Sequence, residues 1–336
     1  MKIKILPLIS FVIPTLNASN ILSKCLESIR TQHYPQKNIE IVIADGGSID
    51  NTRDIGKKFH AKVINNPEIL HEPGKSIASK IAKGDIIFYT DSDNILTHPH
   101  WISMMVKPYL ENSNVIGFLP QTIPAPDSNS LDRYLGYLTT DPFTWFIYDM
   151  TASPSDYTHN YKPIKSTKEY MLYQFPLTNI PLFGLSQGVG VIKKFKKNKK
   201  AYSDDLLAGI KLIEERGIIA YIPKAGVYHY HVDGYINFIK KYTWRVRNNL
   251  NQQIQGMGIT NRTQYFPKRR IIRMYLFVPY GITILFAFID SIKLSIKHHD
   301  AVMLLHPLAC FILSIIIIKE YFQFILQKNK NLGTYQ

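Results

Sequence analysis

Residues 84–93 read GDIIFYTDSD, an apolar run that leads directly into two acidic residues. The first part, residues 85–90, has the length and composition of a buried strand, and Asp91 and Asp93 follow at its end. Residues two apart on an extended chain point to the same side, so these carboxylates repel each other unless a cation bridges them. Hard oxygen ligands suit Mg²⁺ or Mn²⁺. Two solvated loop aspartates are the alternative, but the position at a strand end favours a metal site.

The segments around this strand alternate between two hydrophobic patterns. Short apolar runs typical of buried strands alternate with stretches whose apolar residues recur at helical spacing. We expect strands at residues 8–13, 39–44, 61–64 and 85–90, and helices at residues 21–29, 50–59 and 76–82. This order predicts right-handed βαβ units and a mostly parallel sheet.

Polar residues gather where three of the expected strands end. The sets are Thr15 with Asn17, Asp45 with Ser48, and Asp91 with Asp93. Ligands of open parallel sheets bind beyond the carboxyl ends of the strands. We therefore expect these side chains to converge on a single crevice.

A glycine-lysine-serine triplet at residues 74–76 resembles the tail of a phosphate-binding P-loop. That motif also requires a glycine five residues before the second one, and this position is Ile69. The triplet does not follow the first strand, and no G-x-G-x-x-G sequence follows that strand. The sequence therefore disfavours both a P-loop NTPase and a dinucleotide-binding enzyme.

Acidic, histidine and arginine residues in the second half are further candidates for chemistry. Asp204 and Asp205 could include a general base, although a helix N-cap cluster explains them equally well. His229 and His231 share one face and could ligate the metal or contact phosphate, with a structural role as the alternative. Arg245, in a basic helix, could offset charge on a leaving diphosphate, or could face solvent or lipid headgroups.

Composition limits the class of protein and its partners. The 336 residues are 46% apolar, which allows a sizeable core and argues against a disordered chain. A formal net charge of +15 suits a partner that carries phosphate, whether a nucleotide, a nucleic acid or an anionic lipid. Cys25 and Cys310 cannot build a disulfide framework or a cysteine zinc site, so a cytoplasmic location is expected for the soluble part.

Two stretches near the C-terminus, residues 274–289 and 301–318, contain no Asp, Glu, Lys or Arg. A spanning helix needs about 20 apolar residues, so the second stretch is adequate and the first slightly short. Basic residues within 268–273 precede the first stretch and place its N-terminal side in the cytoplasm by the positive-inside rule. Buried core helices, or a hairpin lying in the membrane interface, are the alternatives.

The order and spacing of several motifs resemble the family 2 glycosyltransferases, inverting enzymes with the fold called GT-A. The resemblance covers residues 8–100, and a weaker match runs from Asp204 to His229. The motifs that carry it are Phe11 to Asn17, Cys25 to Ile29, Ile41 to Ser48, Asp50 to Thr52, and Ala82 to Asp85 leading into Asp91 to Asp93. Departures include Asp204 where glutamate is usual and Lys75 where arginine is common.

The resemblance implies a role for each matching residue. Asp45 is expected to read the nucleotide base, Asp93 to bind the metal directly, and Asp205 of the acidic pair to act as catalytic base. The expected catalytic residues are Asp205 and Asp204; the expected nucleotide-sugar contacts are Pro14, Thr15, Asn17, Asp45, Ser48, Lys75, Asp91 and Arg245; and the expected ligands of a Mn²⁺ or Mg²⁺ cofactor are Asp93, Asp91 and His229.

The expected fold class is α/β, a Rossmann-like GT-A catalytic domain with a mostly parallel sheet, followed by a C-terminal transmembrane helical hairpin. The expected divisions are a GT-A domain at 1–232 (a nucleotide-binding half at 1–100 and an acceptor half at 101–232), a basic amphipathic juxtamembrane segment at 233–270, two membrane helices within 271–326, and a tail at 327–336.

The predicted function is inverting transfer of one sugar from a nucleotide-diphosphate sugar to a lipid-linked or saccharide acceptor, in the synthesis of cell-surface glycans. The partners expected are the donor, a lipid-linked acceptor and the cytoplasmic side of the cell membrane, with no nucleic acid. A polyprenyl-phosphate glycosyltransferase is the nearest alternative. A sugar-phosphate nucleotidyltransferase is an alternative of another class, disfavoured because residues 14–17 lack the glycines of its nucleotide loop.

Overall fold

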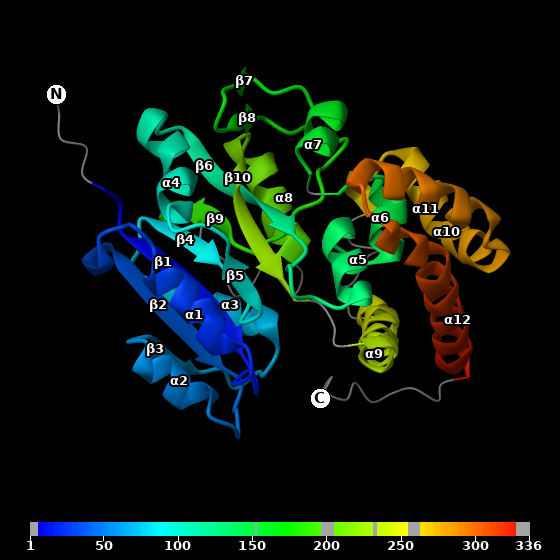
Figure 1. The fold of residues 1–336 in the computed structure, drawn as a ribbon, viewed down its shortest axis with the longest axis horizontal. Helices are drawn as coiled ribbons and strands as arrows, with labels where there is room; N and C mark the ends of the chain where they lie inside the picture. The colour runs from blue at the N-terminus through cyan, green and yellow to red at the C-terminus, as the bar shows by residue number, and fades with distance from the viewer. Residues whose placement is uncertain (1–5, 152, 196–204, 231–233, 255–262, 327–336) are drawn as a thin grey trace. The chain divides into compact units, whose positions relative to one another are not determined.

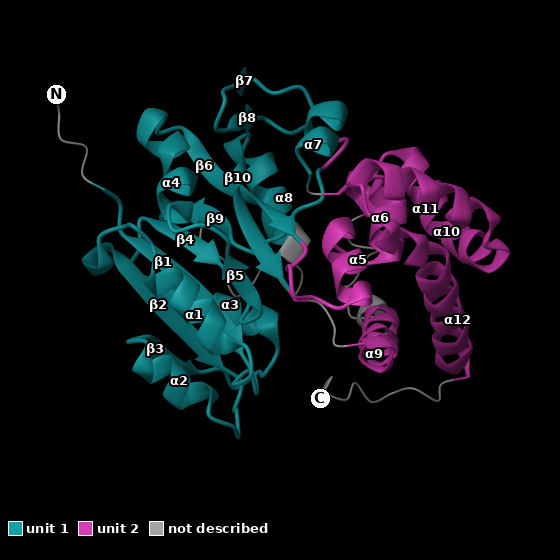
Figure 2. Ribbon diagram, viewed as in Figure 1, with its two compact units in different colours: residues 1–123, 152–177, 181–229 teal, residues 124–151, 178–180, 230–336 magenta. Residues whose placement is uncertain are grey.

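The computed structural model describes residues 6–151, 153–195, 205–230, 234–254 and 263–326 (Figure 1). The chain divides into two compact units (Figure 2). Unit 1 comprises residues 1–123, 152–177 and 181–229, and unit 2 comprises residues 124–151, 178–180 and 230–336.

Unit 1 is built on a mixed sheet that contains ten strands within the described residues, in the order β3-β2-β1-β4-β9-β6-β10-β8-β7, with β5 paired to β10. The four N-terminal strands of this order run parallel, whereas β9 runs antiparallel to both β4 and β6. The strands are β1 (Ile9–Thr15), β2 (Ile39–Asp45), β3 (Lys62–Asn65), β4 (Ile86–Tyr89), β5 (Asn94–Leu96), β6 (Val115–Ile123), β7 (Lys165–Ser166), β8 (Met171–Tyr173), β9 (Val189–Ile192) and β10 (Ile218–His229).

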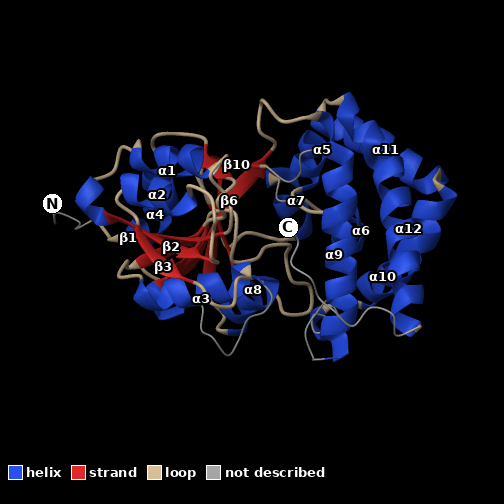
Figure 3. Cartoon of the chain, turned by 90° about the horizontal axis from the view of Figure 1, so that it is seen from below, coloured by secondary structure: helices blue, strands red, loops and turns tan. Residues whose placement is uncertain are grey.

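Helices cover both faces of this sheet, as βαβ connections require. Figure 3 shows α1, α2 and α4 on one face and α3 and α8 on the other. The helical segments of unit 1 are α1 (Leu22–Arg30), η1 (Gln36–Asn38), α2 (Thr52–Lys58), α3 (His71–Ile81), α4 (Trp101–Glu111), α7 (Pro154–Asn160), η2 (Lys193–Phe195) and α8 (Asp205–Glu214).

The centre of the sheet is apolar because its strands are covered on both faces. Every residue of β1 is buried, which explains its continuous apolar run. Phe11 stacks on Phe88 with ring centroids 5.5 Å apart, and Trp101 meets Phe88 edge-on at 5.0 Å. These rings join β1, β4 and the start of α4 in one core cluster. The core fixes the strand ends that carry the polar residues.

Helix α3 begins five residues earlier than the sequence pattern predicted, at His71 rather than Ser76. The triplet at residues 74–76 therefore lies inside this helix and forms no phosphate-binding loop. Gly74 allows close packing, because a Cβ atom there would lie 3.1 Å from Pro14 and 3.0 Å from Asn66. This contact brings α3 against the end of β1.

Unit 2 is helical and combines three segments that are distant in sequence. Helices α5 and α6, from the middle of the chain, share one core cluster with the C-terminal helices. The predicted acceptor half therefore divides, because residues 124–151 cluster with the C-terminal helices instead of with the sheet. The helical segments of unit 2 are α5 (Ser130–Leu138), α6 (Pro142–Tyr148), α9 (Gly234–Ile254), α10 (Lys268–Thr283), α11 (Leu285–His298), η4 (Ala301–Leu305) and α12 (His306–Ile325).

A buried histidine connects α5 and α6 to the C-terminal helices of unit 2. His306 Nδ1 lies 2.7 Å from the Tyr134 hydroxyl of α5, and Nε2 lies 2.9 Å from the Tyr280 hydroxyl of α10. The ring also meets Trp145 of α6 edge-on. Buried polar groups need such partners, so this cluster specifies how α5 and α6 pack on the C-terminal helices.

The C-terminal apolar stretches form one long helix and one bent pair. Among the described residues, the segment Ala301–Ile325 alone is long and apolar enough to cross a membrane as a single helix. The first predicted span is divided at Ile284, where α10 and α11 meet at 95°. Ile284 has φ 59°, which breaks the helix between the two. The expected simple hairpin is thus a bent pair followed by α12.

Candidate functional site

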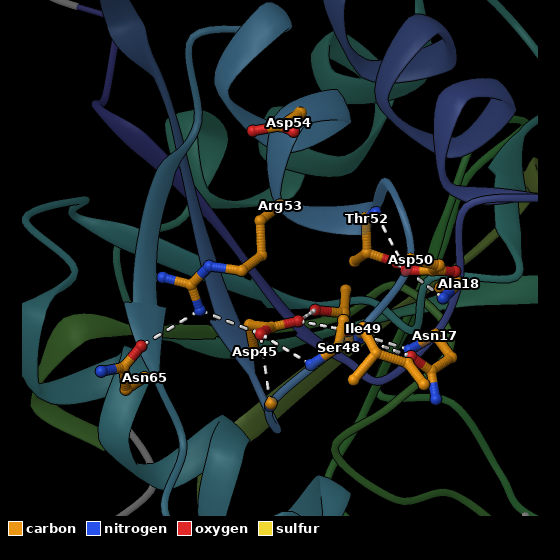
Figure 4. Close-up of polar contacts among 12 residues, drawn as sticks. Asn17, Ala18, Asp45, Ser48, Ile49, Asp50, Thr52, Arg53, Asp54 and Asn65 are labelled. Carbon is orange, nitrogen blue, oxygen red and sulfur yellow. Dashed lines mark hydrogen bonds and ion pairs between the residues drawn. The ribbon is translucent and has the colours of Figure 1, made fainter.

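The carboxylate of Asp45, at the end of β2, organises the turn that follows it (Figure 4). Its Oδ1 accepts hydrogen bonds from the hydroxyls of Thr15, at 3.2 Å, and Ser48, at 2.5 Å. Its Oδ2 accepts from the backbone N–H groups of Gly47 and Ser48, at 3.2 and 3.1 Å, and from Arg53 Nη1 at 2.9 Å. This residue is only 1% exposed.

These bonds define the charge state of Asp45. Burial acts to raise the pKa of this carboxyl, but the hydrogen bonds from Ser48 and Arg53 outweigh it and the pKa is lowered. Both oxygens are already engaged by the protein, so the group shapes the turn at 46–48. Direct reading of a base by Asp45 requires one of these partners to be exchanged.

A second carboxylate joins the loops that follow β1 and β2. Asp50 Oδ2 accepts from Ser19 N at 3.1 Å, and Oδ1 accepts from Thr52 N at 3.0 Å. The side-chain oxygen of Asn17, a residue with φ 45°, accepts a hydrogen bond from Ile49 N at 3.0 Å. The backbone N–H of Asn17 donates to the Ser48 hydroxyl at 2.9 Å. These hydrogen bonds therefore join the two loops, as Figure 4 shows.

Asp50→Asn is expected to destabilise the protein at neutral pH and to have no effect in strong acid. Burial acts to raise the pKa of Asp50, but hydrogen bonds from Thr52 and Ser19 lower it to about 2 from 3.8. The native state therefore binds fewer protons than the unfolded state, so the contribution is present above pH 4 and is lost as pH falls through about 2. Thermal unfolding of both proteins from pH 2 to pH 7 measures the difference, about 1 kcal/mol at the upper end.

Asp54→Asn serves as the matched control for this experiment. Its carboxylate is 78% exposed and pairs only weakly with Lys57, 3.1 Å away. We expect a change of less than about 0.5 kcal/mol at every pH. If the difference in unfolding free energy between Asp50→Asn and the native protein is the same at pH 2 as at pH 7, the ionised Asp50 carboxylate does not stabilise the fold.

Asp91, at the end of β4, is drawn toward α3 by a buried lysine. Lys75 is 1% exposed, and its Nζ lies 3.1 Å from Asp91 Oδ1 and 3.7 Å from Glu72 Oε1. His71 Nδ1 lies 3.9 Å from the same Asp91 oxygen. Burial acts to raise the pKa of Asp91, but the Lys75 ammonium and His71 hold it well below its usual range. Asp91 is thus an ionised partner of a buried cation.

Asp93 faces a histidine from the end of β10. Asp93 Oδ2 lies 3.6 Å from His229 Nε2. Strand pairing places them together, because β5 runs antiparallel to β10 and aligns Asn94 with His229. Asn94 also holds the acidic loop, since its Nδ2 donates to Asp93 Oδ1 at 3.0 Å and its Oδ1 accepts from Asp91 N at 2.9 Å. The second aspartate and the histidine therefore converge from two separate elements.

The residues present fit a divalent metal that shares its shell with a phosphate ligand. Among the described residues, no three acidic, histidine or cysteine side chains lie close enough together to hold a metal alone. The predicted ligand set of Asp91, Asp93 and His229 is therefore not assembled, because Asp91 is engaged by Lys75. Asp93 and His229 remain, and Mg²⁺ or Mn²⁺ ordinarily completes such a shell with water and phosphate oxygens.

The other predicted site residues are placed elsewhere or not described. Asp205 is the first residue of α8, while Asp204 and His231 lie outside the described residues. Arg245 belongs to unit 2, where its Nη1 lies 3.7 Å from Asp141 and its guanidinium covers the Tyr242 ring. These contacts give Arg245 partners in its own unit.

Three residues of the site carried no signal strong enough to predict them. Arg53 supports Asp45, Asn94 supports Asp93, and Gln187 contacts His229. Asn94 follows the acidic pair directly and could have been suspected on that ground. Arg53 reaches Asp45 from the first turn of α2, and Gln187 reaches His229 from the turn before β9.

Comparison with known proteins identifies this architecture. Residues 10–171 match the family model described as glycosyl transferase family 2. Glycosyltransferase AglE of Haloferax volcanii is 30% identical over 109 residues, which cover 30% of this chain and 35% of that protein. The dolichyl N-acetyl-alpha-D-glucosaminyl phosphate 3-beta-D-2,3-diacetamido-2,3-dideoxy-beta-D-glucuronosyltransferase of Methanococcus voltae is 46% identical over 54 residues, 16% of this chain and 17% of that protein.

A solved structure shares the fold over most of the chain. The mannosyltransferase PcManGT from Pyrobaculum calidifontis, in complex with GDP-Man and Mn²⁺, aligns with a TM-score of 0.55 at 12% identity. The alignment covers 94% of this chain and 88% of that one. The chain therefore carries a family 2 glycosyltransferase domain, and its fold is GT-A. Its match spans about a third or less of the curated relatives, 35% of AglE and 17% of the Methanococcus voltae enzyme.

Proposed function

We propose that this protein transfers one sugar, with inversion, from a nucleoside-diphosphate sugar to a lipid-linked acceptor at a membrane surface, in glycan synthesis. The observation that carries the proposal is the Asp93–His229 pair, 3.6 Å apart, at the strand ends of a family 2 glycosyltransferase domain. The complex of PcManGT with GDP-Man and Mn²⁺ supports a nucleotide-sugar donor and a divalent metal.

Each side chain at the strand ends has a distinct task in this proposal. Asp93 and His229 would hold the metal, which supplies positive charge to the departing nucleoside diphosphate. Lys75 keeps Asp91 ionised and fixed, 3.1 Å from its ammonium group. Asp45 and Arg53 fix the turn against which the nucleoside would lie. Asp205 would accept the proton of an acceptor hydroxyl.

The lipid-linked acceptor is proposed from the surface of the C-terminal helices. Exposed apolar side chains run along α10, α11 and α12, and the Methanococcus voltae relative is named for a dolichyl-phosphate substrate. The exposed members are Ile272, Tyr275, Leu276, Ile282, Leu285, Phe286, Phe288, Ile289, Ile292, Ile296, Leu308, Ile315, Tyr321, Phe322 and Ile325. An apolar surface of this extent is typical of contact with a membrane.

The basic residues near α10 contribute less surface charge than their number suggests. Arg270 is 1% exposed; its Nη1 donates to Ile180 O at 2.6 Å, and the guanidinium lies 4.4 Å from the Tyr148 ring centroid. Arg273 pairs with Asp149 at 2.9 Å. Membrane contact in this proposal rests mainly on the apolar side chains, not on these charges.

Replacing Phe286 and Phe288 with serine is expected to weaken vesicle binding on the order of 10- to 100-fold. The two side chains of α11 are 60% and 50% exposed, and each would bury apolar area worth about 1.5 kcal/mol in a membrane. Flotation with vesicles of anionic phospholipid, after detergent removal, measures the bound fraction. The matched control replaces Ile164 and Leu177 of unit 1, which are 56% and 41% exposed. Equal loss in both double variants contradicts membrane contact through α11.

A donor panel tests the transfer itself. The full chain is incubated with UDP-, GDP- and other nucleotide-linked sugars, with and without Mn²⁺ and a lipid extract, and released nucleoside diphosphate is measured. We expect Mn²⁺-dependent release from donors of one base, and release should increase when lipid extract is present. Formation of pyrophosphate from a nucleoside triphosphate and a sugar phosphate would instead assign the protein to the nucleotidyltransferases.

A further inference from the structure

Gln187 lies where β9 enters the sheet between β4 and β6. Because β9 runs antiparallel to both neighbours, its first residues lie at the carboxyl ends of β4 and β6. Gly188 N donates to Tyr89 O at 2.8 Å, which fixes the turn to the end of β4. An inserted antiparallel strand thus delivers Gln187 to the edge that carries the acidic loop.

The backbone of this turn is held in an uncommon conformation. Gln187 has φ 52° and Gly188 has φ 80°. A Cβ atom on Gly188 would lie 3.1 Å from both Trp101 and Val227, so any side chain there would be strained. Positive φ is uncommon for glutamine, and such residues persist where the surrounding structure over-determines them, often at functional sites.

The side chain of Gln187 links two other strands. Thr122 Oγ1, from β6, donates to Gln187 Oε1 at 3.1 Å, and Gln187 Nε2 lies 2.9 Å from His229 Nδ1, at the end of β10. His229 Nε2 in turn faces Asp93 Oδ2 at 3.6 Å. Four residues from four different segments therefore form one chain of contacts, Thr122–Gln187–His229–Asp93.

These contacts determine which nitrogen of the His229 imidazole carries the proton. With Gln187 Nε2 donating to Nδ1, neutral His229 carries its own proton on Nε2, the atom that faces Asp93. A metal at Nε2 needs the lone pair there, so the proton must reside on Nδ1. Rotation of the amide by half a turn presents Oε1 to Nδ1–H. The Thr122 hydroxyl accepts or donates, so it satisfies the amide in either orientation.

We propose that Gln187, held by Thr122, is the positioning residue that sets the ring orientation and tautomer of His229 for metal binding. The inference rests on the proposed function, because it assumes that His229 ligates the metal of the donor complex. The amide is suited to this task since one side chain supplies both a donor and an acceptor, and so serves the metal-free and the metal-bound histidine.

The test is the affinity of the full-length protein for Mn²⁺ in the presence of UDP or GDP, measured by isothermal titration calorimetry. Gln187→Leu removes the acceptor and is expected to weaken Mn²⁺ binding 10- to 100-fold, the usual effect of losing an outer-shell partner. Gln187→Glu keeps an acceptor for Nδ1–H and is expected to bind Mn²⁺ at least as tightly as the native protein. Gln121→Glu, on the same strand as Thr122, adds an equal charge and should leave affinity unchanged.

Further variants separate the possible outcomes. Gln187→Gly accepts the positive φ without strain, so it controls for misfolding and should weaken Mn²⁺ binding as Gln187→Leu does. Native affinity in both variants, together with lost affinity in His229→Ala, overturns the role of Gln187 and leaves the metal site intact. Weak binding by Gln187→Glu overturns it equally. Native affinity in His229→Ala means that the proposed metal site itself is wrong.

Discussion

Asp93→Asn is expected to lower the turnover number of sugar transfer by at least about 10³-fold. A metal at the departing diphosphate contributes several kcal/mol to the transition state, and each 1.36 kcal/mol is a factor of ten in rate. The asparagine retains a carbonyl oxygen that can still accept from Asn94 Nδ2, now 3.0 Å from Asp93 Oδ1. The acidic loop should therefore keep its shape while the charge that binds the metal is lost.

Two further measurements make the Asp93 result specific. Raising the Mn²⁺ concentration should restore only part of the activity of Asp93→Asn, because a neutral amide is a weak ligand for a hard cation. Thermal unfolding should show nearly native stability. If Asp93→Asn keeps native turnover and an unchanged Mn²⁺ requirement, the metal does not bind through this carboxylate.

Asp205→Asn is expected to lower turnover on the order of 10²- to 10⁴-fold, with little change in donor affinity. A general base acts in the transition state and contributes little to donor binding. The residue is the first of α8, a position where an acidic side chain also stabilises a helix by about 0.3–1 kcal/mol. Steady-state kinetics and thermal unfolding together separate the catalytic role from the helix-stabilising one.

Asp54→Asn is the matched control, because Asp54 is an acidic residue in the first turn of α2. It should lose a similar small amount of stability and retain full turnover. If Asp205→Asn behaves in the same way, Asp205 only stabilises its helix, and the acceptor is then better sought among lipid phosphates, which need no strong base. Loss of donor affinity at normal turnover would move Asp205 to the donor site.

The first hundred residues could be predicted because the patterns that define their strands are local. The buried strands β1 and β2 each appear in the sequence as a short, mostly apolar run of consecutive residues. The polar residues at their ends follow directly in the sequence. Asp45 and Asp93 were predicted on this basis. The start of α3 was predicted five residues too late, and Gly74, which packs closely against Pro14, lies within the helix.

The contacts that decide the site are less visible in the sequence. The engagement of Asp91 by Lys75 depends on α3 packing beside β1 and β2, and nothing in the spacing of these residues shows it. Gln187 reaches His229 only because β9 enters the sheet antiparallel between two parallel segments. Nothing in the local sequence pattern shows the direction of this strand.

The packing of unit 2 also depends on contacts between residues that are distant in the sequence. Tyr134 of α5 meets His306 of α12 across 172 residues of sequence. Arg247 of α9 similarly pairs with buried Glu320 of α12, at 2.8 Å. The middle helices and the apolar C-terminal helices share one core. A truncation near residue 264 would therefore expose the core of α5 and α6.

The central claim is that Asp93 and His229 bind one divalent metal together with the diphosphate of the donor. Pulsed electron paramagnetic resonance of Mn²⁺ bound to the full-length protein with UDP or GDP tests it most directly. The predicted result is coupling of Mn²⁺ to one imidazole nitrogen and to phosphorus, with the nitrogen coupling absent in His229→Ala and Mn²⁺ binding lost in Asp93→Asn. Bound Mn²⁺ that shows phosphorus coupling but no nitrogen coupling, and that is unaffected by Asp93→Asn, would contradict the claim.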